Sequence, residues 1–184
     1  MWLKILVALG ILVLVVLVIL GLAAARPARM RVERSIVIDA PPSKIYRLVN
    51  DFHNWKQWAP GDKDDPTSNR TYSGAEAGVG AVSNWRGNGN TNSARMEITG
   101  GAQDAQVVVT VDFAAPFVAH NVNTYTFEAT GGTSTGMVLT RVTWDFDGQN
   151  VFVMRVMGVF VNMDKTMGKH FEDGLANLKV AAEK

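Results

Sequence analysis

The chain has 184 residues, which is enough for one ordinary domain plus an appendage. Its 18 lysines and arginines nearly balance its 17 aspartates and glutamates, so the composition gives no reason to expect a nucleic-acid partner. Cysteine is absent, which excludes disulfides, thiolate nucleophiles and cysteine-based metal sites.

The N-terminal part is an almost unbroken apolar run over residues 5–25, interrupted only by Gly10 and Gly21. A helix needs about 20 residues to cross the hydrocarbon core of a bilayer, whereas the apolar core of a signal peptide has about 7–15. We therefore predict a single-span membrane anchor with its linker over residues 1–29. The three alanines at 23–25 leave a cleaved signal peptide as the alternative.

Basic residues flank this span unequally. Only Lys4 precedes it, whereas four arginines follow it at positions 26, 29, 31 and 34. The positive-inside rule then predicts that the C-terminal domain lies in the cytoplasm. The alternative is that these arginines partly belong to the first strand and say little about topology.

The next segment predicts a strand followed by two short helical pieces. Residues 30–38 alternate loosely and end in β-branched side chains, which indicates a strand. Two prolines in the turn at 39–43 are compatible with the first turn of a helix. That helix places Ile45, Leu48, Val49 and Phe52 on one face, and Trp55 and Trp58 share a face if their segment is also helical.

Residues 59–69 form a polar segment that contains Asp62, Asp64 and Asp65. Three carboxylates suggest a calcium loop, but the glycine and the downstream glutamate of such a loop do not fall in register. We predict a solvated loop and no metal site.

From Arg70 onward, short strand candidates alternate with glycine-rich turns. The candidates lie around Tyr72 and at residues 81–86, 94–99, 105–113, 121–129 and 137–146. This spacing is typical of successive antiparallel hairpins and not of βαβ units, and with the first strand the count is about seven. Alternation gives the sheet one aromatic face with a few polar groups, which includes Trp85, Met96, Asn123, Tyr125 and Trp144.

The last segment, residues 151–182, carries apolar side chains at steps of three or four. They are Phe152, Val156, Phe160, Met163, Met167, Phe171, Leu175 and Leu178. This stripe predicts one long helix with an apolar face, and the preceding strands supply the surface that the face needs. The expected fold class is α+β, with a curved antiparallel sheet of about seven strands wrapped on a long C-terminal helix.

Motifs of catalysis and of cofactor binding are mostly missing from the sequence. His53, His120 and His170 are not at metal-ligand spacing, and neither a Gly-x-Ser-x-Gly elbow nor a phosphate loop occurs, so no cofactor is expected. His120 with Asn121 and Asn123 is the best polar cluster. It could orient a carbonyl and move a proton, or its members could simply be hydrogen-bonded locally.

Three strings carry a family resemblance: RSIVIDAPPSKIYRLVNDFHNWKQW at 34–58, APFVAHN at 115–121 and VMGVFVNMDKTMGKHFEDGLANLK at 156–179. They resemble the polyketide cyclase/dehydrase-like branch of the START-like (SRPBCC) superfamily over residues 30–182, and the Met163-Asp164-Lys165 string resembles one bacterial subgroup. The resemblance implies a helix-grip domain at 30–184 with a deep hydrophobic cavity between sheet and helix. It implies no conserved catalytic set, and it makes a bacterial inner membrane the expected location.

Our leading hypothesis is a membrane-anchored binding module for a lipid-like or polycyclic small molecule, with the membrane contacted through residues 5–25. The expected ligand-binding residues are Trp55, Trp58, Trp85, Met96, His120, Asn123, Tyr125, Trp144, Phe160, Met163 and Met167. One alternative is a polyketide cyclase or dehydratase that uses His120. Another is a non-catalytic interaction protein whose own side chains fill the cavity, because aromatic residues also dominate ordinary cores.

Overall fold

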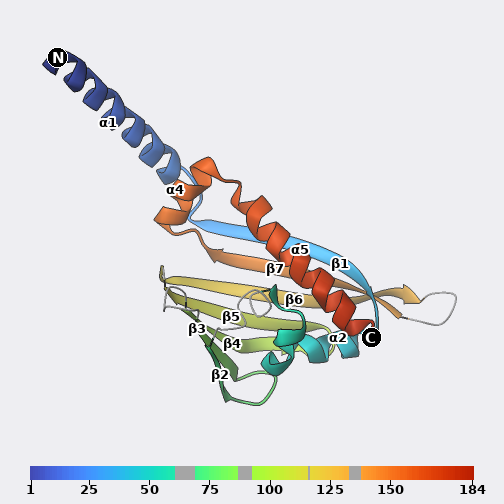
Figure 1. Ribbon diagram of the computed structural model, residues 1–184. Helices are drawn as coiled ribbons and strands as arrows, with labels where there is room; N and C mark the ends of the chain where they lie inside the picture. The colour runs from blue at the N-terminus through green and yellow to red at the C-terminus, as the bar shows by residue number, and fades with distance from the viewer. Residues whose placement is uncertain (61–68, 87–92, 116, 133–137) are drawn as a thin grey trace.

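The computed structural model describes residues 1–60, 69–86, 93–115, 117–132 and 138–184. Asp62, Asp64 and Asp65, for which a solvated loop is predicted, lie outside these residues. An N-terminal helix, α1 (Trp2–Ala24), projects from a sheet that carries helices on one face (Figure 1). The strands are β1 (Arg29–Asp39), β2 (Asn69–Gly74), β3 (Ala81–Arg86), β4 (Ser93–Ala102), β5 (Gln106–Ala115), β6 (Ala119–Gly132) and β7 (Val138–Gln149).

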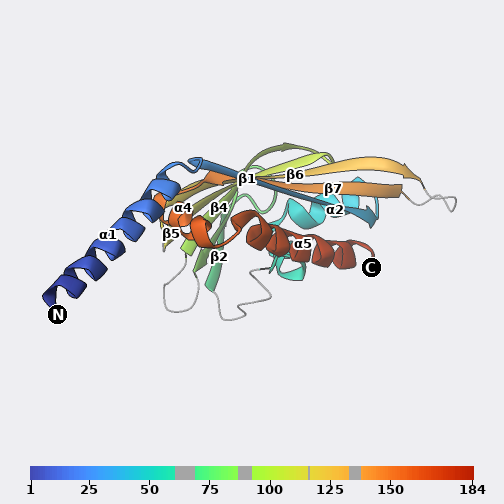
Figure 2. The same ribbon diagram turned by 90° about the horizontal axis from the view of Figure 1, so that it is seen from above.

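These seven strands form one antiparallel sheet in the order β1-β7-β6-β5-β4-β3-β2. From β2 to β7 each strand pairs with the next one in the chain, and β1 closes the order beside β7. Figure 2 shows the helices α2 and α5 together on one side of this curved sheet. The predicted α+β fold, with about seven antiparallel strands and a long C-terminal helix, is confirmed.

Two short helical elements, which the sequence predicts, pack on the sheet. They are α2 (Pro42–Val49), which begins at a proline, and the 3-10 helix η1 (Phe52–Gln57). Helix α2 contacts β6 and β5, and η1 contacts β3. The indole nitrogen of Trp55 donates to the carbonyl of Val49 at 2.9 Å, and that of Trp58 donates to the carbonyl of Leu48 at 3.0 Å. Both indoles are therefore buried with their N–H groups satisfied, which fixes η1 against α2.

The C-terminal segment is two helices, so the predicted start of a single helix at residue 151 is wrong. Helix α4 (Phe152–Phe160) is separated from α5 (Met163–Ala182) by Val161, whose backbone is extended. The Asn162 side chain accepts a hydrogen bond from the amide of Lys165 at 3.0 Å and so caps α5. The apolar stripe of α5 packs on the sheet, whereas Phe152 and Phe160 of α4 are exposed.

Helix α5 is fastened to β1 by charged side chains. The guanidinium of Arg34 contacts Asp164 and Glu172, each at 3.0 Å. At the other end of the helix, Glu183 accepts a hydrogen bond from the amide of Asp39 at 2.8 Å, and this bond lowers the pKa of the Glu183 carboxyl. The two attachments set the orientation of α5 across the sheet.

Helix α1 is the described helix that is long and apolar enough to cross a membrane, and an N-terminal signal sequence would meet the same criterion. Nearly all of its side chains are exposed. Ala23, in its last turn, is 0% exposed, and this end of α1 packs against α4. The remaining apolar surface has no cover within the described chain.

Candidate functional site

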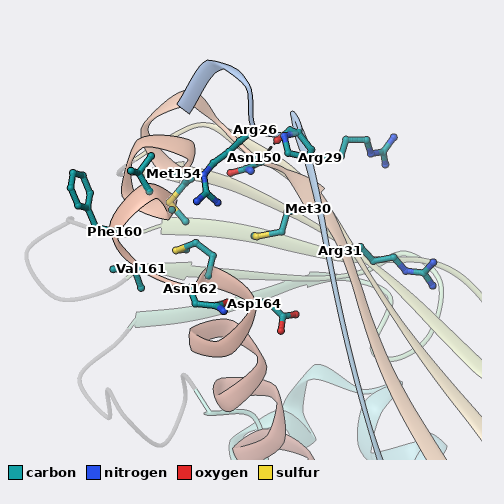
Figure 3. A pocket seen from close by; sticks show the side chains of 14 residues that line it. Arg26, Arg29, Met30, Arg31, Asn150, Met154, Phe160, Val161, Asn162 and Asp164 are labelled. Carbon is teal, nitrogen blue, oxygen red and sulfur yellow. Dashed lines mark hydrogen bonds between the residues drawn. The ribbon is translucent and has the colours of Figure 1, made fainter. Parts of the chain in front are cut away.

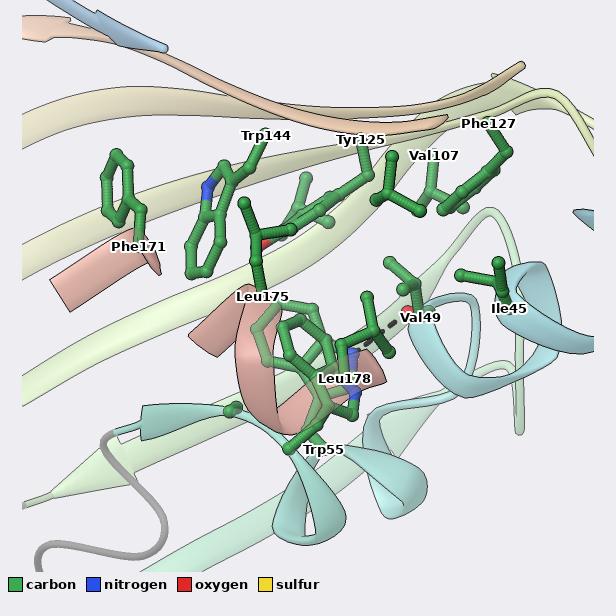
Figure 4. Close-up of a cluster of buried hydrophobic side chains, with 14 of the residues drawn as sticks. Ile45, Val49, Trp55, Val107, Tyr125, Phe127, Trp144, Phe171, Leu175 and Leu178 are labelled. Atoms are coloured by element: carbon green, nitrogen blue, oxygen red, sulfur yellow. Dashed lines mark hydrogen bonds between the residues drawn. The ribbon is translucent and has the colours of Figure 1, made fainter. Parts of the chain in front are cut away.

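Aromatic side chains fill the space between α5 and the middle of the sheet. Trp144 stacks on Phe171 of α5 with ring centroids 4.3 Å apart, and its centroid lies 5.0 Å from that of Tyr125. Trp58 reaches both Tyr125 and Trp144 at about 6 Å (5.9 and 6.0 Å). Figure 4 shows Phe171 and Leu175 of α5 beside Trp144 and Tyr125 of the sheet. The cluster is a packed core of the kind that stabilises a fold.

Two polar groups lie inside this core. Asn123 accepts a hydrogen bond from the Trp144 indole at 2.8 Å, so its carbonyl oxygen is satisfied. The Tyr125 hydroxyl is buried and has no hydrogen-bond partner within the described residues. Burial of this phenol raises its pKa well above 10.0. The neutral phenol is therefore the form that the folded core holds.

Tyr125→Phe is expected to keep or raise the free energy of unfolding, because an unpaired buried hydroxyl costs about 1–3 kcal/mol. In the wild type, only the unfolded chain ionises this phenol once the pH rises through its ordinary value of 10.0, so stability is full below that pH and falls above it. The variant should lack this alkaline loss. Chemical denaturation of both proteins at neutral and alkaline pH measures it. An equal alkaline loss in the variant would contradict the assignment to Tyr125.

A cavity of about 570 Å³ lies at the other end of the helical layer, where α1, α4, β1 and α5 meet. Its apolar lining includes Met30, Met154, Val159, Phe160 and Met163. Figure 3 shows Met30 and Met154 directed inward from opposite sides, beneath Arg26. This volume lies within the range of about 300–1,000 Å³ that is usual for small-molecule sites. The flexible methionine side chains would let the lining adapt to different apolar shapes.

Three arginines, with Asn150, Asn162 and Asp164, form the polar part of the cavity wall, and two of the arginines are paired. Arg29 pairs with Asp147, and Arg31 pairs with Asp145 and Glu33. Hydrogen bonding to Asp145 is the main cause that raises the pKa of Arg31. Arg26 differs, because it is exposed and its guanidinium makes no hydrogen bond or ion pair with any described residue. Asp164, the acidic residue in the lining, is engaged with Arg34.

Apart from His120, the predicted ligand-binding residues lie in three groups. Trp55, Trp58, Asn123, Tyr125 and Trp144 lie together in the aromatic core, and Trp85, Met96 and Met167 are half-buried against it. Phe160 and Met163 line the cavity. This cavity lies beside the break between α4 and α5, whereas aromatic side chains lie beneath the middle of α5.

His120 does not join Asn121 and Asn123, so the predicted polar cluster is not formed. The two asparagines are buried on the inner face, whereas the side chain of His120 is 70% exposed and pairs with Asp112 of β5. Successive residues of a strand point to opposite faces, which separates His120 from its neighbours. This position removes the basis for a catalytic His120 within the core.

Arg26, Met30 and Met154 are cavity residues that the sequence analysis did not select. In the sequence, Arg26 is a charge beside the predicted span and Met30 is the first residue of a predicted strand, so neither pattern indicates a cavity. The spacing of Met154 places it outside the apolar stripe of a continuous helix. It nevertheless lines the cavity, because α4 ends before Val161 and packs separately from α5. The four methionines between residues 154 and 167 were the sequence feature that could have indicated an adaptable apolar lining.

The architecture, an antiparallel sheet gripped by a C-terminal helix, is shared with several solved proteins. XoxI from Bacillus cereus is 17% identical, with a TM-score of 0.57 over 83% of this chain and 94% of that one. Major latex-like protein 151 from Panax ginseng is 13% identical, with a TM-score of 0.57 over 86% of this chain and 100% of that one. DynU16, of the dynemicin biosynthetic locus, is 15% identical with a TM-score of 0.51, over 84% of this chain and 47% of that one.

These similarities define the class as a helix-grip fold. Residues 29–183 match the family described as polyketide cyclase / dehydrase and lipid transport, and the chain belongs to that family. Membership implies binding of a hydrophobic small molecule or lipid. A comparison with curated proteins finds no significant match.

Proposed function

We propose that the protein is a membrane-anchored module that binds a hydrophobic, lipid-like small molecule, with α1 as a single transmembrane span. The observation that carries the proposal is the methionine-lined cavity at the C-terminal end of the exposed apolar helix α1. Residues 1–29 are the anchor and its linker, residues 30–184 are the binding domain, and the excess of arginines after the span favours a cytoplasmic domain.

The surface beside the cavity also favours a position at the bilayer. Helix α4 and its C-cap expose five large apolar side chains, with exposed fractions of 41–69%: Phe152, Val153, Met157, Phe160 and Val161. They adjoin the end of α1, against which α4 packs. Large exposed apolar patches mark interaction sites on soluble surfaces, and a neighbouring bilayer would cover this one. An apolar ligand could then pass between bilayer and cavity with little exposure to water.

The binding proposal is tested by native mass spectrometry of the full chain after gentle detergent extraction. The wild-type protein is expected to carry an apolar adduct. Met154→Glu introduces a carboxylate into the cavity lining and should abolish the adduct, because a charged group in place of Met154 is unfavourable against an apolar ligand. Val180→Glu adds the same charge at an exposed site on α5, outside the cavity lining, and should retain the adduct.

Two outcomes would count against the binding proposal. One is a wild-type protein that is free of adduct and also fails to bind a fluorescent fatty acid. The other is an adduct that survives Met154→Glu with unchanged occupancy in a folded protein, because the ligand would then lie elsewhere. Circular dichroism of both variants establishes that they are folded.

A further inference from the structure

We infer that the cavity takes a single-chain amphiphile with an anionic head, a carboxylate or a phosphate, and that Arg26 binds this head. The inference rests on the proposed function and specifies the chemical class of its ligand. Its starting observation is the guanidinium of Arg26, which has no partner among the described residues, whereas Arg29 and Arg31 beside it are already paired; the Asn150 Oδ1 atom of the lining also has no partner.

Arg26 is positioned to serve the cavity. It follows the last turn of α1 by two residues, and its backbone amide donates to the carbonyl of Ala23 at 3.2 Å. Figure 3 shows its side chain directed into the cavity, whereas those of Arg29 and Arg31 point away. A Cβ atom at Gly158 of α4 would lie 3.2 Å from the Arg26 Nη1 atom. The glycine therefore leaves room for the guanidinium to lie close to the α4 backbone.

The charge balance favours an anion over a neutral or cationic head. Asp164 is the carboxylate of the lining, and it accepts from Arg34 at 3.0 Å, so it does not neutralise Arg26. An arginine fork presents paired N–H donors that match carboxylate or phosphate oxygens. We therefore expect an anionic head to bind about tenfold more tightly than an uncharged head on the same chain.

The apolar lining accounts for the rest of the ligand. Met30, Met154 and Met163 lie within the same cavity as Arg26, so a chain attached to the bound head would meet them. The position of Arg26 just beyond α1 would also place the head where lipid headgroups lie if α1 spans a bilayer. An acid with one alkyl chain satisfies both parts of the site, whereas an uncharged polycyclic ligand would make no contact that uses the charge of Arg26.

The test uses the full chain in nanodiscs of phosphatidylcholine and three photoreactive probes of equal chain length. One is a fatty acid, one an alkyl phosphate and one a fatty alcohol. Cross-linked peptides are located by mass spectrometry, and labelling of the peptides that contain Met154 or Met163 is compared at a mildly alkaline pH. At least one of the two anionic probes is expected to label these peptides about tenfold more than the alcohol does. Which one does so identifies the head as carboxylate or phosphate.

Two variants of equal charge sharpen the result. Arg26→Gln should lower labelling by the preferred anionic probe to the level of the alcohol. Arg95→Gln removes the same charge from an exposed side chain that pairs with Glu97 and lies outside the cavity lining, and it should change little. Labelling that falls equally in both variants would indicate a general charge effect and overturn the assignment to Arg26.

The same experiment separates this inference from the function beneath it. If acid, phosphate and alcohol label the cavity peptides equally, the anionic head is wrong while hydrophobic binding stands. If all three label only peptides of α1 and none of the cavity, both the ligand class and the proposed binding site are wrong.

Discussion

Replacing Trp144 with alanine is expected to lower the free energy of unfolding by about 3–5 kcal/mol, the usual range for removing a large buried aromatic side chain. Trp144 is 6% exposed, stacks on Phe171 and contacts Tyr125 and Trp58. Its loss would leave a cavity in the contact between α5 and the sheet and would leave the Asn123 carbonyl oxygen without its donor. Denaturant unfolding of the full chain in detergent, followed by far-ultraviolet circular dichroism, measures the change.

Trp144→Phe is the matched control for this prediction. It keeps a ring against Phe171 and removes the indole N–H, so its cost should be mainly that of an unpaired Asn123 oxygen, about 1–3 kcal/mol. An alanine variant that loses less than about 1 kcal/mol would contradict a tightly packed core. That result would restore the expectation of an open ligand cavity beneath the middle of α5.

The second large effect is expected at Gly174, the glycine of α5 that faces two rigid rings. A Cβ atom there would lie 2.8 Å from the Trp144 ring and 2.9 Å from the Pro60 ring. Glycine to alanine in a helix normally stabilises by about 0.5–1 kcal/mol. Here overpacking should reverse the sign and cost about 1–3 kcal/mol.

Gly168→Ala supplies the comparison within the same helix. Its added Cβ would meet the guanidinium of Arg34, the movable end of a long side chain, so the helix can gain from alanine while weakening exposed ion pairs. We expect a small net change at Gly168 and a clear loss at Gly174 in thermal or denaturant unfolding. A stabilised Gly174→Ala protein would show that α5 lies farther from Trp144 than the structure places it.

Much of the fold could be predicted because its signals are local. Alternation within the predicted strands 105–113, 121–129 and 137–146 indicates which side chains share the inner face of the sheet. The glycine-rich turns indicate that successive strands are antiparallel neighbours. The break between α4 and α5 is not evident in the sequence, because the apolar stripe continues from Phe160 to Met163 across it and periodicity alone does not indicate a change of helix direction. The asparagine cap at Asn162 was the local sign that a new helix begins there.

The candidate site was harder to predict, because it depends on which segments meet in space. The aromatic residues were correctly expected to lie together, but whether they line a space or fill it depends on volumes contributed by α2, η1, β6, β7 and α5. His120 and Asn121 are adjacent in sequence and lie on opposite faces of the sheet. Arg26 and Met154 are far apart in the chain, and only the packing of α4 against α1 and β1 brings them to one cavity.

The sequence by itself determined the apolar N-terminal helix, the antiparallel strands and the C-terminal amphipathic helix, because each follows from the periodicity and composition of a continuous segment. Only the tertiary structure decided that the central space is packed, that α4 turns away from α5 and that a cavity opens beside α1. These features depend on side-chain volumes and on contacts between distant segments, which no local pattern encodes.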